Sequence, residues 1–563
     1  MQFLDWLVIG LFFIALIGII LWVMRQKQNN AADYFLGGKD ATWIAIGASI
    51  FASNIGSEHL IGLAGSGASS GMAMAHWEIQ GWMILILGWV FVPFYTRSMV
   101  YTMPEFLERR YNPASRTILS LISLISYVLT KVAVTVYAGG LVFQQVFGID
   151  QVWGIDFFWI AAIGLVLITA LYTIFGGMKS VLYTSVLQTP ILLLGSLIIL
   201  VLGLKELGGW DKMMEICSAV QVNEYGDSMT NLIRDNRDGD FPWLGALIGS
   251  AVIGFWYWCT DQFIVQRVLS GKDEREARRG TIFGAYLKLL PVFLFLIPGM
   301  IAFALHQSTG SFLPMLENGN LNTDAAFPTL VAKLLPAGVK GLIVCGILAA
   351  LMSSLASLFN SSAALFTIDF YQRYKPDTDP KKLVRIGQAA TVVIVILGIL
   401  WIPIMRSIGD VLYLYLQDVQ SVLAPGIAAA FLMGVLWKRA TAQGGMWGLI
   451  AGLVIGLTRL GAKIYYSNAA TMPGEDGFNI FRYLFYDVNW LFFCGWMLVF
   501  CLLVVWVISL CTKAPEPEKI RGLVFGTSTP EQQAATRASW NHWDVIHSVI
   551  ILGITAAFYI YFW

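Results

Sequence analysis

Long apolar segments recur along the whole chain, and they constrain its fold more than any other feature. Runs of about 20 residues with few charges follow one another from Phe3 to the last residues, and a helix of that length crosses the hydrocarbon core of a bilayer. Charged residues make up only 13% of the chain, about half their share in soluble domains. The sequence therefore predicts an all-α polytopic membrane protein.

The apolar runs divide into about 14 predicted transmembrane helices. The first run lacks a preceding basic stretch and an obvious small-residue cleavage site, so we expect a retained helix. Two polar connections are long, 205–242 and 307–335, and the stretch 512–541 reads as a tether to the last helix. The expected spans are 3–25, 42–70, 74–96, 116–147, 152–175, 180–204, 243–266, 280–306, 336–370, 383–406, 410–437, 443–465, 488–511 and 542–563.

Positive charges are distributed unevenly over the connections. Most of the 36 Lys and Arg residues fall in alternate connections, starting with the one after the first predicted helix. Because basic connections stay in the cytoplasm, we expect both termini outside. The absence of a targeting extension favours a plasma membrane, and among these a bacterial inner membrane.

Several classes of protein are disfavoured by what the sequence lacks. There is no Walker motif and no soluble domain with paired catalytic groups, which argues against ATP-driven transport and against an enzyme. Nucleic acid is not an expected partner. The 6 cysteines form neither a disulfide framework nor a metal-ligand spacing.

The predicted helix at 42–70 carries the polar run Ser53-Asn54-Ile55-Gly56-Ser57-Glu58-His59 at its centre. Polar groups at that depth are costly and should face protein or water. Gly56, among side chains that compete for backbone hydrogen bonds, marks a place where the helix can open. An opened helix frees carbonyl oxygens for a cation. The alternative is a helix packed on small residues, with its ionisable side chains hydrogen-bonded in the core.

Other predicted helices carry polar residues that can face the same interior. In His76-Trp77-Glu78 a carboxylate lies between aromatic rings, an arrangement that suits the hydroxyls and the C–H face of a sugar. The alternative is an interfacial Trp with a snorkelling Glu. Lys288 and Lys131 lie in apolar surroundings without a close partner in sequence, and snorkelling is an alternative for them too.

The stretch from Gly254 to Gln262 is polar and aromatic for a membrane helix. Helical spacing places Gly254, Tyr257, Trp258 and Asp261 on one face. Core packing of the aromatic residues is the alternative interpretation. The predicted helix at 410–437 adds Gln417, an amide that can bind a hydroxylated solute, and Tyr413.

In the predicted helix at 336–370, small and hydroxyl side chains recur with helical spacing at one face. They pack neighbouring helices closely or complete an oxygen cage for a monovalent cation. The residues are Ala350, Ser353, Ser354, Ser357 and Ser361.

The two helices that look broken lie five predicted spans apart. This spacing is typical of secondary transporters with inverted repeats and discontinuous first core helices. If the first broken helix opens one five-helix unit, the second opens the next, and the pattern argues for alternating access without identifying a solute.

In these segments the chain resembles the sodium:solute symporter family, specifically its sodium/glucose cotransporter branch. The likeness covers nearly the whole chain and rests on short motifs. These are Ala48-Ser49 through Glu58, Gly65-Ser66-Gly67, Pro104-Glu105-Phe106, Trp256-Tyr257-Trp258-Cys259-Thr260-Asp261-Gln262 and Ser353-Ser354-Leu355-Ala356-Ser357 with Asn360-Ser361.

The resemblance implies a ten-helix inverted-repeat core in a five-plus-five arrangement at 42–437, with repeats at about 42–204 and 243–437. An extra helix and loop at 1–41 would precede this core, and three peripheral helices at 438–563 would follow it.

The resemblance also implies roles for individual residues. The sodium site would use the carbonyls of Ala52, Ile55 and Ala350 and the hydroxyls of Ser353 and Ser354. The outer gate would consist of Leu63, Trp77 and Tyr413, and the inner gate of Tyr257. The substrate-binding residues would be Asn54, His59, Glu78, Tyr257, Trp258, Lys288 and Gln417.

Three positions depart from the family pattern. Gly254 and Gly81 stand where similar sugar carriers have polar side chains, and we expect the two glycines to enlarge the pocket. Ser185 stands where members with a second cation site tend to carry an Asp. A serine lacks the charge that would help to hold a second sodium, so we expect one sodium per solute.

Together these patterns predict a sodium-coupled symporter that imports a glucose-like or galactose-like monosaccharide by alternating access. The expected partners are a monosaccharide or polyol, a co-transported sodium ion and the lipid bilayer. The same fold carrying myo-inositol, a sialic acid or another organic solute stays open as an alternative. So does a non-transporting sugar sensor or sodium leak.

Overall fold

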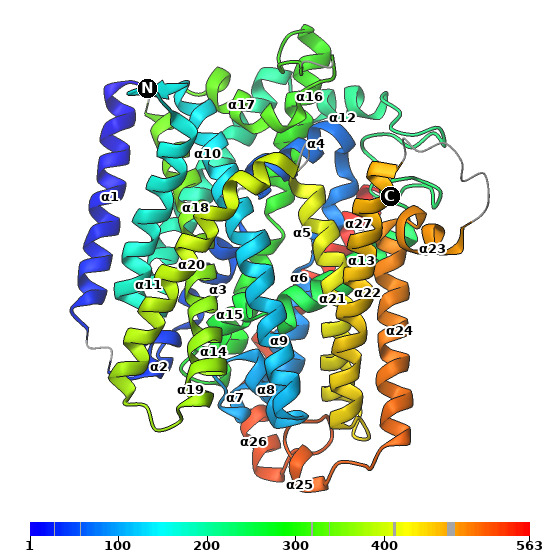
Figure 1. The fold of residues 1–563 in the computed structure, drawn as a ribbon. Coiled ribbons are helices and arrows are strands. Elements are labelled where there is room, and N and C mark those ends of the chain that lie inside the picture. The colour runs from blue at the N-terminus through cyan, green and yellow to red at the C-terminus, as the bar shows by residue number, and fades with distance from the viewer. Residues whose placement is uncertain (27–28, 57, 317–318, 337, 409–411, 470–478) are drawn as a thin grey trace.

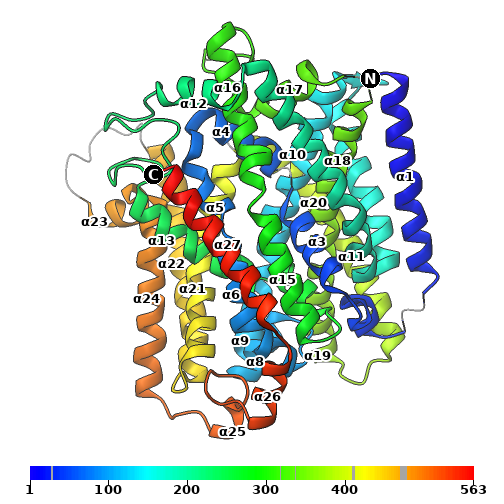
Figure 2. The same ribbon diagram turned by 180° about the vertical axis from the view of Figure 1, so that it is seen from behind.

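The computed structural model describes residues 1–563 except 27–28, 57, 317–318, 337, 409–411 and 470–478. Most of the described chain is helical, and the helices stand side by side as one bundle (Figures 1 and 2). Both termini lie toward the same end of that bundle. The short strands β1 (Gln151–Val152) and β2 (Ile155–Asp156) form an antiparallel hairpin.

The helical elements occupy the predicted spans, but several spans are interrupted and two of them lie within one helix. The first part of the chain contains α1 (Phe3–Met24), α2 (Ala31–Phe35), η1 (Gly37–Lys39), α3 (Trp43–Asn54), η2 (Glu58–Leu63), α4 (Ala64–Ser70), η3 (Gly71–Met74), α5 (Ala75–Glu78), α6 (Gly81–Ile86), η4 (Leu87–Phe91), α7 (Val92–Ser98), α8 (Met103–Arg110), α9 (Pro113–Ser126), η5 (Tyr127–Val132), α10 (Ala133–Phe147) and α11 (Phe157–Leu207).

The middle part contains α12 (Trp210–Ser218), α13 (Trp243–Gly254), η6 (Phe255–Thr260), α14 (Gln262–Leu269), α15 (Glu274–Lys288), η7 (Val292–Leu296), α16 (Ile297–Thr309), η8 (Thr323–Ala325), α17 (Ala326–Leu334), α18 (Val339–Ala364), η9 (Leu365–Tyr371) and α19 (Gln372–Tyr374). The last part contains α20 (Pro380–Ile408), α21 (Leu412–Leu436), α22 (Ala442–Ala469), α23 (Ile480–Arg482), η10 (Tyr483–Asp487), α24 (Trp490–Cys511), α25 (Pro517–Ile520), α26 (Pro530–Ala538) and α27 (His542–Tyr561).

Among the described residues, 11 helical segments are long and apolar enough to cross a membrane. The number is lower than the predicted one partly because two predicted spans fall within α11. A straight helix of its 51 residues would be about 77 Å long, far more than a bilayer core of about 30 Å. Gly177, with φ 53° and ψ −150°, kinks α11 between the two predicted spans. The multi-pass class is confirmed, whereas the count of 14 and the inverted repeat stay predictions.

Two helices are interrupted in the interior of the bundle. α3 ends at Asn54, Ile55 has an extended backbone with ψ 107°, and helical structure is present again from Glu58. The second interruption is at Asp261, whose backbone is extended with ψ 128° between η6 and α14. The Asp261 side chain accepts a hydrogen bond from the backbone N–H of Phe263 (3.2 Å), so it caps the helix that follows the break.

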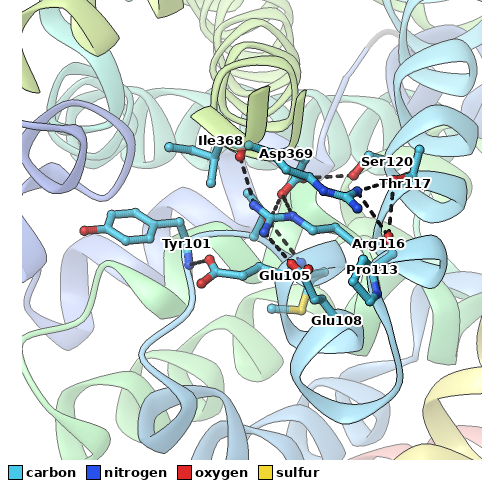
Figure 3. A network of polar contacts seen from close by, with 12 residues as sticks. Tyr101, Glu105, Glu108, Pro113, Arg116, Thr117, Ser120, Ile368 and Asp369 are labelled. Atoms are coloured by element: carbon cyan, nitrogen blue, oxygen red, sulfur yellow. Dashed lines mark hydrogen bonds and ion pairs between the residues drawn. The ribbon is translucent and has the colours of Figure 1, made fainter. Parts of the chain in front are cut away.

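A polar network joins α9 to η9 (Figure 3). The Arg116 guanidinium donates to a carboxylate oxygen of Asp369 (2.7 Å) and to one of Glu108 (2.6 Å). Ser120 and Thr102 also donate to Asp369. Because the buried carboxylate has a cation and two hydroxyls as partners, its burial is compensated, and the network ties the start of α9 to the end of the α18–η9 helix.

The predicted tether at 512–541 is docked on the bundle at the end opposite the termini (Figures 1 and 2). The backbone N–H of Phe525 donates to the carbonyl of Val435 (2.7 Å), and Arg97 donates to Ser528 (2.8 Å). Arg278 of α15 donates to Ser539. The tether therefore contacts both the α7–α15 side and the end of α21.

Close packing of α4 against α16 depends on Gly299. A Cβ atom at this position would lie within 3.0 Å of the carbonyl oxygen of Ala64, a distance that real Cβ atoms essentially never show. Gly67 on the facing helix is enclosed in the same way by Leu296. Small residues at such crossings let two membrane helices approach closely.

We expect Gly299→Ala to destabilise the protein by about 1–3 kcal/mol, because the added methyl group forces α4 and α16 apart. Gly553→Ala in α27 is the matched control, since nothing lies within 4 Å of its Cβ position. The measurement is the thermal unfolding midpoint of each purified variant. Equal midpoints for the two variants would contradict the tight crossing.

Candidate functional site

A cavity lies where the two interrupted helices meet. Its walls come from α3, η2, α5, η5, α10, α13, η6, α14, α15, α18 and α21. The structure brings together all of the predicted substrate-binding residues, which are Asn54, His59, Glu78, Tyr257, Trp258, Lys288 and Gln417. These residues come from segments that are far apart in the sequence, and the structure shows that they line one cavity. The roles assigned to them stay predictions.

The centre of the cavity is an ion pair. The Lys288 ammonium lies 2.7 Å from a carboxylate oxygen of Glu78 and donates to the amide oxygen of Asn54 (3.0 Å). Lys288 is 3% exposed and Glu78 is 2% exposed, which excludes the snorkelling alternative for both. A buried charge needs such a partner, so α5 and α15 are held at a fixed separation.

Three side chains of the cavity wall have a buried polar atom for which the described residues supply no hydrogen-bond partner. They are His59 Nε2, Trp77 Nε1 and Gln417 Oε1. His59 Nε2 also lies 3.4 Å from Glu78 Oε2, a charge contact only when the imidazole is protonated. Buried polar atoms are nearly always paired, so these atoms mark positions that a polar solute can satisfy.

Two aromatic rings of the wide π-helical turn η6, those of Tyr257 and Trp258, line the cavity. Tyr257 accepts a hydrogen bond from the Asn54 amide (3.2 Å), and its ring meets the Trp258 ring edge-on with centroids 4.9 Å apart. The predicted common face of η6 is wrong at Asp261, which does not line the cavity. Because the helix is interrupted there, Asp261 turns instead to Lys131, at 2.6 Å.

Lys131 is therefore a wall residue with a partner. It is buried, lines the cavity and lies over the rings of Tyr257 (4.8 Å) and Phe263 (4.7 Å). The sequence singles out Lys131 and Asp261 separately, but no local spacing connects them. Each carries a charge that the other compensates.

Two further wall residues, Glu58 and Gln80, are absent from the predicted site. Glu58 belongs to the polar run at the first break, so the run itself was a signal for it. Gln80 follows the end of α5 and precedes α6. Glu78 and Gln80 both face the cavity, although helical spacing would place residues two apart on different sides. They can do so because the helix is interrupted between Glu78 and Gln80.

The two glycines that depart from the family pattern do not enlarge the cavity, and that expectation is wrong. A Cβ atom on Gly254 would lie 2.5 Å from Gln80 Oε1, so the Gln80 side chain already fills the space. A Cβ atom on Gly81 would lie 2.8 Å from the carbonyl oxygen of Ala285. Gly81 serves the contact between α6 and α15.

The predicted gate residues have different surroundings. Leu63 is fully buried but does not line the cavity. Trp77 lines it and stacks on Trp490 with ring centroids 5.6 Å apart. The side chain of Tyr413 lies outside the described residues.

An oxygen-rich cluster lies at the first break, beside the cavity. The Ser354 hydroxyl lies 2.9 Å from the carbonyl oxygen of Ser53 and 3.3 Å from that of Ile55. Ser353 Oγ lies 3.2 Å from Ser185 Oγ. Ser354 also lines the cavity, so the cluster and the cavity share a wall.

The rest of the small-residue face of α18 follows the predicted spacing. Ser357 lies 2.7 Å from the Ser53 hydroxyl, and Ser361 donates to Gln266 (2.9 Å). Ala52 and Ala350, predicted as carbonyl ligands, are buried in α3 and α18. The described residues contain no group of three or more His, Cys, Asp or Glu that could hold a metal ion, so the donors available here are carbonyls and hydroxyls.

We expect Lys288→Met to destabilise the protein by about 3–5 kcal/mol, because it leaves the Glu78 carboxylate buried without its cation. Adding Glu78→Gln should recover much of that loss. Arg482→Gln is the control, since its pair with Asp487 is exposed and worth about 1 kcal/mol or less. Thermal unfolding midpoints test this, and a Lys288→Met midpoint equal to that of the unchanged protein would contradict it.

Known proteins are similar in sequence to this chain over most of its length. The model of the sodium:solute symporter family matches residues 34–452. The chain is 36% identical over 542 residues to sodium/myo-inositol cotransporter 2 of Oryctolagus cuniculus, a match that covers 93% of this chain and 79% of that protein. It is 36% identical over 539 residues to sodium/glucose cotransporter 4 of Danio rerio, covering 92% and 80%.

A solved structure of a sodium-coupled sialic acid symporter, in a substrate-bound outward-open state, has the same fold. The superposition has a TM-score of 0.71 at 21% identity and covers 92% of this chain and 99% of that chain. At that identity the likeness concerns the fold alone. Because the family model and relatives at 36% identity both cover most of the sequence, the chain belongs to the sodium:solute symporter family.

Proposed function

We propose that this sodium-coupled solute symporter imports a neutral polyhydroxylated ring, a monosaccharide or a cyclic polyol, by alternating access. The observation that carries the proposal is the cavity itself. A carboxylate, an ammonium, amides and aromatic rings meet there in one buried space. Such groups bind hydroxyls by hydrogen bonds and cover the apolar faces of a ring.

The pairing of charges favours a neutral solute over an acid. Each buried lysine of the wall has a carboxylate within 2.7 Å, Lys288 with Glu78 and Lys131 with Asp261. Neither ammonium is therefore left to neutralise a carboxylate on the solute. The relatives named for glucose and for myo-inositol carry six-membered polyhydroxylated rings by their names, and we take both as candidate solutes.

Sodium would bind at the first break. Its ligands would be the carbonyls of Ala52, Ile55 and Ala350 with the hydroxyls of Ser353 and Ser354. Sodium there would raise the affinity for solute, and solute would raise the affinity for sodium by the same factor. The inward driving force is the sodium gradient plus about 2.3 kcal/mol per 100 mV for each charge moved.

One sodium per solute fits the surroundings of Ser185. Its hydroxyl lies 3.2 Å from Ser353 Oγ and 3.4 Å from Ser49 Oγ, so this cluster is built from neutral oxygens. A second sodium would have no formal negative charge there to compensate its own. We further propose a ten-helix inverted-repeat core at 42–437 and a plasma-membrane location with both termini outside.

We expect proteoliposomes containing the protein to accumulate labelled glucose, galactose or myo-inositol under an inward sodium gradient, but not when potassium replaces sodium. The carried solute should be competed by the other two rings. At zero membrane potential, a tenfold sodium gradient should hold about a tenfold solute gradient for one sodium per solute, and about a hundredfold gradient for two.

Other outcomes identify the alternatives. Accumulation of a sialic acid or another organic acid, with no uptake of the three rings, would refute the neutral-solute proposal. Sodium currents without accumulation of any sugar would indicate a sensor or a leak.

We expect Ser354→Ala to raise the sodium concentration needed for half-maximal uptake by roughly tenfold, because it removes an oxygen ligand of a charged ion. Ser308→Ala is the control, since its hydroxyl donates within α16 to Ala304 (2.9 Å), outside the site. Sodium-dependent uptake at saturating solute gives both values. An unchanged sodium requirement in Ser354→Ala would remove this hydroxyl from the sodium site.

A further inference from the structure

Gln80 holds a defined orientation in the cavity wall. It is 3% exposed, and its amide bridges two groups of the α13–η6 helix. The indole N–H of Trp258 donates to Gln80 Oε1 (3.1 Å), and Gln80 Nε2 donates to the carbonyl of Ser250 (2.8 Å). Because an indole can only donate and a carbonyl can only accept, chemistry fixes which end of the amide carries the oxygen.

The space for this amide is provided by Gly254. A Cβ atom on Gly254 would lie 2.5 Å from Gln80 Oε1 and 2.8 Å from Gln80 Cδ. Gly254 also lines the cavity. Any larger residue at position 254 therefore pushes the amide out of its place, and the glycine and the glutamine act as one unit.

Among the residues that the structure describes, these two bonds account for half of the amide's hydrogen-bonding capacity. A glutamine amide has two N–H donors and two acceptor lone pairs. Trp258 uses one lone pair and Ser250 uses one N–H. One donor and one acceptor of this cavity-lining amide remain, and a hydroxyl group, which is itself a donor and an acceptor, can bind to either of them.

We propose that Gln80, in the space left by Gly254, determines solute specificity by binding one hydroxyl of the ring. This inference rests on the proposed function and names a recognition group within it. A solute that lacks this hydroxyl leaves the remaining amide N–H and lone pair buried and unpaired. Sites built to hydrogen-bond a hydroxyl reject such analogues strongly.

The test is a double-mutant cycle of Gln80→Ala, Gly254→Ala and the combined variant. For each protein, the half-saturating concentration is measured for the carried solute and for each of its mono-deoxy analogues. Gln80→Ala should weaken the carried solute by about five- to tenfold and leave one particular deoxy analogue nearly unchanged. Gly254→Ala should give the same selective loss, and it should add little once Gln80 is already Ala.

Two further variants separate recognition from packing. Gln80→Met keeps the volume of the side chain but removes its amide, so it should show the same selective loss even if Gln80→Ala folds poorly. Gln388→Ala removes a partly buried amide that donates to the carbonyl of Ile174 (3.1 Å), outside the cavity. It should keep the original rank order of the analogues.

The inference is overturned if Gln80→Met weakens the carried solute and every deoxy analogue equally, or if the effects of the Gln80 and Gly254 changes are additive. The first result would make Gln80 a packing residue, and the second would show that Gly254 does not act through Gln80. The proposed function still stands in both cases. If the unchanged protein carries no neutral ring, the proposed function fails first. The cycle is then measured with the solute that is carried, and an unselective effect there overturns the inference as well.

Discussion

The interruption of α3 at Ile55 is the constraint on which the arrangement of the site depends. At bilayer depth every backbone N–H and C=O needs a partner, and the residues after Asn54 leave the helical ladder. The Ser354 hydroxyl lies beside the carbonyls of Ser53 and Ile55. α18 therefore supplies a hydrogen-bond donor to carbonyls at the interrupted end of α3. A face of α18 with small, hydroxyl-bearing side chains must therefore lie directly against the break. The elements that form the cavity are arranged around that contact.

Buried charge imposes the second constraint. Lys288 pairs with Glu78 across α15 and α5, and Lys131 pairs with Asp261 across η5 and the second break. Each pair fixes the distance between two elements, because separating the partners would leave a charge buried alone. The ion pairs thus set the positions of the walls, while neutral atoms such as Gln417 Oε1 have no hydrogen-bond partner among the described residues. The proposed binding of hydroxyl groups depends on that division.

Patterns contained within one helix could be predicted from local spacing. Relations between helices could be predicted only where the family resemblance supplied them, as it did for the seven grouped substrate-binding residues. The opening expected at Gly56 in the polar run and the hydroxyl face of α18 both depend on local patterns. In the structure α3 ends at Asn54, two residues before that glycine, and the hydroxyl face lies against the break. The pairing of Lys131 with Asp261 joins residues 130 positions apart, and no local pattern connects them. The expectation that Gly254 and Gly81 enlarge the pocket was wrong for a related reason. A missing side chain enlarges a pocket only if nothing else fills the space, and at Gly254 the Gln80 side chain fills it.

The proposed coupling between sodium and solute needs no long path through the protein. Ser354 belongs to the oxygen cluster and to the cavity wall. Asn54, the last residue of α3, donates to Tyr257 and accepts from Lys288. A cation that draws together the Ile55 carbonyl and the Ser354 hydroxyl would fix the last turn of α3, and with it the Asn54 amide. A solute that engages the partners of Asn54 would stabilise the same turn. If both ligands bind as proposed, they favour one conformation of one helical turn, and each would raise the affinity for the other.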